Sequence, residues 1–119
     1  MALETEKGTV VEIRVDIDRT LCTYERIDGR KTAVPIREVI DKVNDLFDAG
    51  HKITIWTSRN VISRSDQTQF TKKQLASWGV RYHVLDLQKP LFDLFIDDRS
   101  VNVHHWMQGL EIPDLGEDI

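Results

Sequence analysis

A short apolar run that carries two carboxylates constrains this chain more than any other feature. Residues 10–17 are predicted to form a β-strand because apolar side chains recur at every second position: Val11, Ile13, Val15 and Ile17. Asp16 and Asp18 lie two residues apart at its carboxyl end, so both side chains leave the same face. Two such anions repel, and a divalent cation between them is the simplest remedy. The alternative is a strand end with two solvated acids.

Length and composition limit the classes of protein to consider. The 119 residues fit a single domain, 1–119, with a core at about 9–107 and an acidic tail at 108–119. The net charge of −4 gives no electrostatic case for nucleic acid. Cys22 is the single cysteine, which excludes an internal disulfide and a cysteine-based zinc site. Since no apolar run approaches membrane-spanning length and residues 1–8 do not resemble a secretory signal, we expect a cytoplasmic protein without a membrane partner.

The pattern along the chain alternates between strands and helices. Helical spacing of apolar residues predicts a helix between Pro35 and Gly50, and a second helix is expected to end near Trp78. Short β-prone runs predict strands at 53–56, 80–85 and 91–98, and residues 100–107 are expected to form a short helix. Residues 21–34, with the turn signal Asp28-Gly29, are predicted to form a small flap over the end of the first strand.

This alternation predicts an α/β fold, a Rossmann-like parallel sheet sandwiched by helices. Right-handed crossovers would place all strand carboxyl ends at one edge, where ligands bind in open α/β sheets. Polar clusters end three of the predicted strands: Asp16 with Asp18, Thr57-Ser58-Arg59, and Asp97-Asp98. Lys89 lies in the connection before the last of these. Hydroxyls, Arg and loop amides are donors suited to phosphate oxygens, so this edge is predicted to be the functional site.

In this order the clusters resemble the four motifs of the haloacid dehalogenase (HAD) superfamily of phosphohydrolases. Asp16-Ile17-Asp18-Arg19-Thr20 matches Asp-x-Asp-x-Thr, and the strand ending at Thr57 matches the second motif. Lys89 matches the basic third motif, and Asp97-Asp98 matches the fourth. The chain looks most like the small capless members described as capsule or polysaccharide biosynthesis phosphatases, so no cap domain is expected. Arg19 departs from the pattern, because Gly is common at that position, and a long cation there could alter substrate choice.

The resemblance implies a mechanism and a magnesium ion. Asp16 would attack phosphorus and form an aspartyl-phosphate, while Asp18 would protonate the leaving alcohol and then activate water. Thr57 and Lys89 would complete the catalytic set, and the substrate-binding residues would be Thr57, Ser58, Arg59, Lys89 and Arg19. Mg²⁺ would be held by Asp16, the Asp18 backbone carbonyl and Asp97, with Asp98 as a second ligand or as support for the first.

The subfamily likeness alone makes a small phosphorylated sugar or related metabolite the expected substrate. A nucleotide or polynucleotide phosphatase is the second candidate, disfavoured by the lack of a basic surface. A Mg²⁺-binding regulatory domain without turnover is the third. Only the flap at 21–34 could cover the site from within the chain. Members of this kind take bulky substrates or use a neighbouring subunit as a lid, so a homo-oligomer whose neighbouring subunit covers the site is also a possible arrangement.

Overall fold

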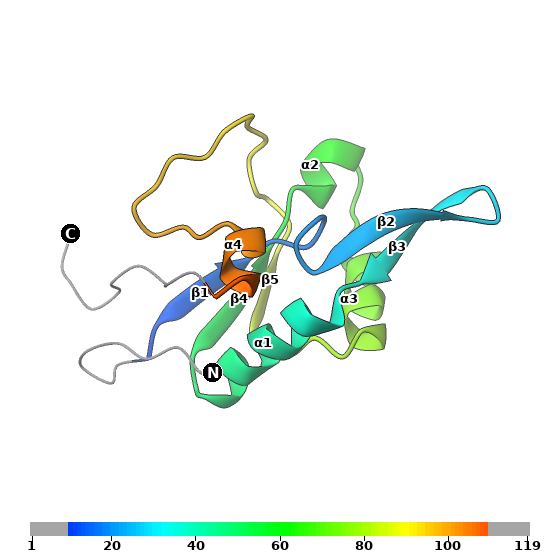
Figure 1. Ribbon diagram of the computed structural model, residues 1–119. Helices are drawn as coiled ribbons and strands as arrows, with labels where there is room; N and C mark the ends of the chain where they lie inside the picture. The colour runs from blue at the N-terminus through cyan, green and yellow to red at the C-terminus, as the bar shows by residue number, and fades with distance from the viewer. Residues whose placement is uncertain (1–9, 110–119) are drawn as a thin grey trace.

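The computed structural model describes residues 10–109, in which a three-stranded parallel sheet positions the predicted site (Figure 1). Its strands run in the order β1 (Glu12–Val15), β4 (Lys52–Trp56) and β5 (Val84–Asp86). In register, Val15 lies opposite Ile55 and Trp56 lies opposite Asp86. The prediction of a parallel, Rossmann-like α/β sheet is confirmed. The predicted strand at 80–85 is shorter, because the backbone at Val80 still bonds to the end of the preceding helix, at Leu75.

Helix α1 (Arg37–Asp48) supplies four buried residues of the core, and α3 (Thr68–Ser77) adds Leu75. Helix α1 buries the apolar face that its sequence spacing predicts, and α3 ends one residue before Trp78. Two single-turn helices complete the described chain. Helix α2 (Arg59–Ser63) follows β4, and α4 (Val103–Met107) lies near the end of the described residues. No helix within residues 10–109 is long and apolar enough to cross a membrane.

The sheet is covered by helices on one face, which corrects the predicted sandwich. Arg37 donates to the Trp78 carbonyl and Asn44 to the Gly79 carbonyl, so α1 lies against the end of α3 on the same side of the sheet. Two consecutive right-handed crossovers in one direction require this arrangement. The other face of the described sheet carries polar pairs, including Glu12–Lys52 and Arg14–Asp86.

Residues 21–34 contain the hairpin turn that Asp28-Gly29 predicts. Strands β2 (Cys22–Ile27) and β3 (Arg30–Pro35) pair antiparallel around Asp28-Gly29. Both turn residues have left-handed φ angles, 52° and 77°, which match the right-handed twist of a tight hairpin. The hairpin projects away from the parallel sheet (Figure 1), and its first residue follows directly from the loop that carries Asp18.

The predicted fourth strand is wrong for the described chain. Residues 91–98 have no strand pairing, and Leu94 and Ile96 are 75% and 89% exposed. The connection explains the error. β5 ends at Asp86, on the edge where Lys89 lies, and a further parallel strand must start from the opposite edge. Such a return needs a crossover of about a dozen residues, and only 87–90 are available.

Candidate active site

A tight turn after β1 carries the two predicted catalytic carboxylates. The backbone N–H groups of Thr20 and Leu21 both donate to the Ile17 carbonyl, at 3.1 and 2.8 Å, which folds the chain back toward the hairpin. Arg19 adopts a left-handed φ of 62° at the apex of this turn, and its side chain is exposed. A left-handed backbone favours Gly, so Arg19 holds a conformation that is costly for a residue with a side chain.

Lys89 lies beside Asp16, as predicted. Its Nζ is 3.6 Å from Asp16 Oδ2, and both side chains are largely withdrawn from solvent. Burial raises the pKa of Asp16 above its ordinary value, and the charge of Lys89 opposes that rise. The rings of Trp56 and Phe92 lie 5.2 and 5.5 Å from the same ammonium group. Lys89 therefore supplies a positive charge in a partly apolar surrounding, where it acts most strongly on an anion.

Asp18 is held by a cation and a phenol. The Arg59 guanidinium donates to both carboxylate oxygens, and the Tyr24 hydroxyl donates to Oδ1. Burial alone would raise the pKa of Asp18, but the hydrogen bonds from Arg59 and Tyr24 outweigh it, so the pKa is lowered. The third guanidinium nitrogen of Arg59, Nη1, donates to the Thr71 hydroxyl at 3.2 Å, which links Arg59 to α3.

Thr57 and Ser58 connect the ends of β4 and β5. The Thr57 N–H donates to the Asp86 carbonyl at 2.9 Å, and its own carbonyl accepts from the Lys89 N–H at 3.1 Å. The Thr57 hydroxyl accepts from the Arg59 N–H at 3.2 Å, and Ser58 Oγ donates to the Pro90 carbonyl at 3.4 Å. These bonds bring the second and third motif segments to the same edge as the β1 turn.

The sequence did not single out Tyr24, Trp56 or Phe92 as site residues. Tyr24 is a strand residue of the hairpin, and the available signal was its place between the polar residues Thr23 and Glu25. Trp56 precedes Thr57 by one residue, and Phe92 follows Lys89 by three. Their contact with the site depends on rings reaching across from neighbouring segments, which residue spacing does not specify.

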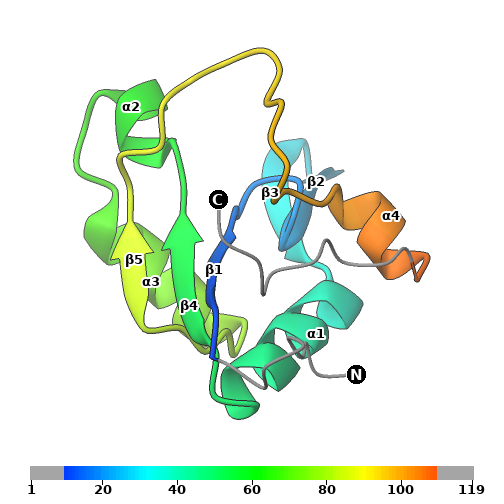
Figure 2. The same ribbon diagram turned by 90° about the vertical axis from the view of Figure 1, so that its left-hand side faces the viewer.

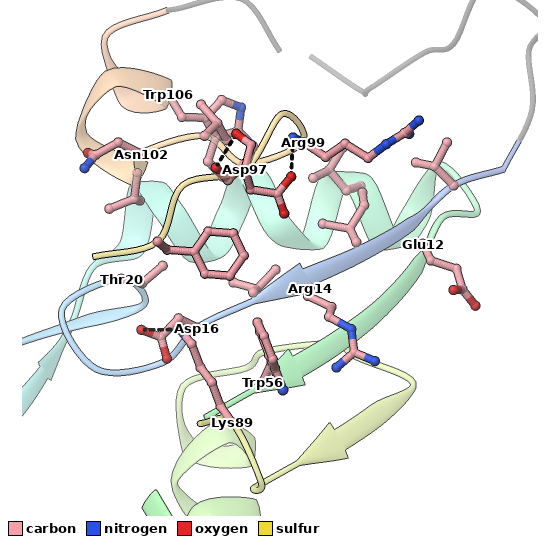
Figure 3. A pocket seen from close by; sticks show the side chains of 18 of the residues that line it. Glu12, Arg14, Asp16, Thr20, Trp56, Lys89, Asp97, Arg99, Asn102 and Trp106 are labelled. Carbon is pink, nitrogen blue, oxygen red and sulfur yellow. Dashed lines mark hydrogen bonds and ion pairs between the residues drawn. The ribbon is translucent and has the colours of Figure 1, made fainter. Parts of the chain in front are cut away.

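The fourth predicted cluster is not brought to the carboxylates of the β1 turn. Asp97 lines a cavity of about 920 Å³ that also reaches Asp16 and Lys89, but it lies across that cavity from Asp16 (Figure 3). Its carboxylate accepts the Arg99 N–H at 2.8 Å, and Asp98 is exposed on the same segment.

The donor set for a magnesium ion is therefore incomplete in this chain. No three acidic, histidine or cysteine side chains of the described residues are placed to hold a metal together. Asp16 and Asp18 are the two carboxylates of the turn after β1, and each is matched by a cation, Lys89 and Arg59 respectively. Without Asp97, the predicted ligands do not fit an octahedral oxygen site.

Comparison with known proteins supports the fold. The chain is similar to the crystal structure of a structural-genomics target from Vibrio cholerae, with a TM-score of 0.70 and 21% sequence identity. The superposition covers 82% of this chain and 88% of that one. No protein-family model and no curated protein matches the sequence. At this level of identity the likeness shows a shared α/β fold.

Proposed function

We propose that this protein is a phosphomonoester hydrolase of the HAD type. The observation that carries the proposal is the pair of ion pairs Lys89–Asp16 and Arg59–Asp18 at the carboxyl edge of a parallel sheet. One carboxylate beside a lysine and a second beside an arginine, two residues apart, suit a nucleophile and an acid–base group acting on the same phosphate.

The first half-reaction would transfer the phosphoryl group to the protein. An Asp16 oxygen forms a bond to phosphorus as the bond from phosphorus to the substrate oxygen breaks. The leaving oxygen takes a proton from Asp18, so an alcohol departs and an aspartyl-phosphate remains. Lys89 offsets the negative charge that Asp16 and the phosphoryl oxygens bring together.

The second half-reaction would release inorganic phosphate. Asp18, now ionised, takes a proton from water as that water attacks the phosphorus of the aspartyl-phosphate. The bond to the Asp16 oxygen breaks, and both carboxylates return to their starting states, with Asp18 again carrying a proton like the one that it gave to the leaving oxygen. The Mg²⁺ that the resemblance implies is also proposed, but no step here passes through it, because the described chain does not complete its ligands.

Arg59 gives the acid–base group a way to respond to substrate. Its hydrogen bonds help to keep Asp18 ionised, whereas a general acid must carry a proton. An incoming phosphate dianion competes for the same guanidinium, since Arg binds phosphate as it binds carboxylate. Withdrawal of Arg59 toward phosphate would let the Asp18 pKa rise when a proton is needed.

The experiment is the release of phosphate from p-nitrophenyl phosphate with Mg²⁺, with chelated protein and Asp16→Asn as controls. A non-catalytic Mg²⁺-binding domain would release none, and that result would overturn the proposal. A panel of phosphorylated sugars and nucleotides would then separate the two substrate classes. We propose a small phosphorylated sugar or related metabolite as the substrate, on the subfamily likeness alone.

A further inference from the structure

Two parts of the molecule are complementary but do not meet. Within residues 10–109, β1 pairs with β4 alone, so its other edge presents unpaired backbone groups. We call residues 91–97 the exchange segment. It is β-prone and apolar, and it arches away from the sheet between Lys89 and helix α4 (Figure 2). Proteins rarely leave both an open strand edge and a run of exposed apolar residues without using them.

The exchange segment cannot fill this edge in its own chain and also deliver Asp97 to Asp16. A parallel strand would have to begin at the opposite edge of the sheet, roughly 20 Å away for six residues. Residues 87–90 cannot make that crossover. An antiparallel strand could start near Lys89, but it would carry Asp97 toward the edge opposite Asp16.

A second copy of the chain removes this conflict. If two copies lie side by side with their strands running in opposite directions, the carboxyl edge of one sheet is level with the amino edge of the other. The exchange segment leaves the first copy after Lys89 and enters the second at the start of β1 with no crossover. It then runs parallel to β1 and ends at the edge where Asp16 lies. The same two-fold operation returns the partner's segment, so the assembly closes as a dimer.

Side-chain alternation fits the same pairing. Along β1, Ile13 and Val15 pack toward the core, whereas Glu12 and Arg14 lie on the exposed face with Asp16 following in phase. In the exchange segment one face is wholly apolar, with Phe92, Leu94 and Ile96, and the other carries Asp93, Phe95 and Asp97. Matching apolar to apolar puts Asp97 on the same face as Asp16.

We propose that residues 91–97 are exchanged between two copies of this chain, each segment adding a strand to the partner's β1 and supplying Asp97 to the partner's Asp16. Helix α4 would travel with the segment and take on the partner the position that it now has on α1, where Lys42 donates to the Trp106 carbonyl at 3.1 Å. The strand exchange stands on geometry alone. Its role in completing a Mg²⁺ site rests on the proposed function.

The first test is the mass in solution. Light scattering should give twice the chain's 13.8 kDa for the unmodified protein. Leu94→Lys with Ile96→Lys should give a folded monomer whose circular dichroism spectrum loses no more than the signal of the exchanged strand, because both side chains are exposed in the single chain. Ile62→Lys, at a 65% exposed apolar residue on α2, is the matched control and should stay dimeric. A monomeric unmodified protein, or a double variant that stays dimeric, would overturn the exchange.

The second test asks whether each site is shared. Asp16→Asn and Asp97→Ala chains carrying different tags are co-expressed, and mixed dimers are isolated by both tags. In a mixed exchanged dimer one site has both substitutions and the other has neither, so about half of the unmodified activity should return. Activity no higher than in the two parent variants would show that Asp97 is not delivered between chains. If the unmodified protein hydrolysed no phosphate ester, the proposed function would fail while the mass measurement still decided the exchange.

Discussion

Arg59 donates hydrogen bonds to both carboxylate oxygens of Asp18, with Nε 3.1 Å from Oδ2 and Nη2 2.9 Å from Oδ1. The pair joins the turn after β1 to the start of α2, two segments that are 41 residues apart in sequence. Since the Arg59 side chain is 10% exposed, the ion pair is poorly screened by solvent. The pKa of Asp18 is therefore lowered by the hydrogen bonds from Arg59 and Tyr24, which outweigh the effect of burial.

Tyr24→Phe should move the basic limb of the pH–rate profile to higher pH. Burial raises the pKa of Asp18 and is the largest single effect on it. The hydrogen bond that the Tyr24 hydroxyl donates to the carboxylate acts in the opposite direction and helps to keep the pKa low. Without that donor the pKa rises, and a general acid stays protonated to higher pH. Measurement of kcat/KM from pH 4 to 9 checks this; a limb that stayed or moved downward would remove Asp18 from the role of acid.

Asp16→Asn should lower phosphatase activity by at least about a thousandfold, because the amide keeps the shape but cannot attack phosphorus. The measurement is kcat/KM with p-nitrophenyl phosphate. Asp41→Asn, on the exposed side of α1, is the matched control and should retain activity. Retention of most activity by the Asp16 variant would rule out an aspartyl-phosphate.

The same Asp16→Asn variant should be more stable than the unmodified protein at neutral pH in EDTA. Burial raises the folded-state pKa of Asp16, with Lys89 opposing, so the stability linked to this group is present at low pH and lost as pH rises through the folded pKa. The gain should therefore shrink toward pH 3, where aspartate is protonated in both states. Urea unfolding midpoints measure it, and a gain that grew on acidification would contradict the cause given.

Lys89→Ala should cost roughly 3 kcal/mol in transition-state stabilisation, the scale of one electrostatic donor lost from a dry site. Lys72→Ala and Lys73→Ala should cost little, because both side chains are exposed on α3. Comparison of kcat/KM among the three variants is the measurement. If Lys72→Ala or Lys73→Ala lost most of its activity while Lys89→Ala kept it, the basic residue of the site would have to come from α3.

Under the proposed function, chelation should abolish phosphatase activity, and Asp97→Ala should raise the Mg²⁺ concentration needed for half-maximal activity or abolish activity. The reason is that the variant would lose the anionic oxygen ligand that the proposed exchange brings to Asp16, in a site that needs several. A Mg²⁺ titration of each variant measures the effect, with Asp98→Ala as the comparison. An unchanged titration for Asp97→Ala would move the ligand role to Asp98.

Local pattern was sufficient for the parts of the fold that depend on neighbours in sequence. Period-two and period-3.6 spacing placed β1 and α1, and Asp28-Gly29 located the hairpin turn. The shared edge for Asp16, Thr57 and Lys89 also followed, since parallel strands with right-handed crossovers have few alternatives. That reasoning depends on alternation along the chain, which the sequence carries directly.

Tertiary structure decided which of these residues touch and where the last apolar run goes. Tyr24 and Arg59 meet at Asp18 through segments whose separation in sequence says nothing about distance. Residues 91–98 have the composition of a buried strand, yet in the described chain they lie outside the sheet. Composition sets how much a segment gains by burial, whereas the length of the connection before it sets which strand edge it can reach. Here residues 87–90 are too few to carry residues 91–98 to the open edge of β1 in the same chain.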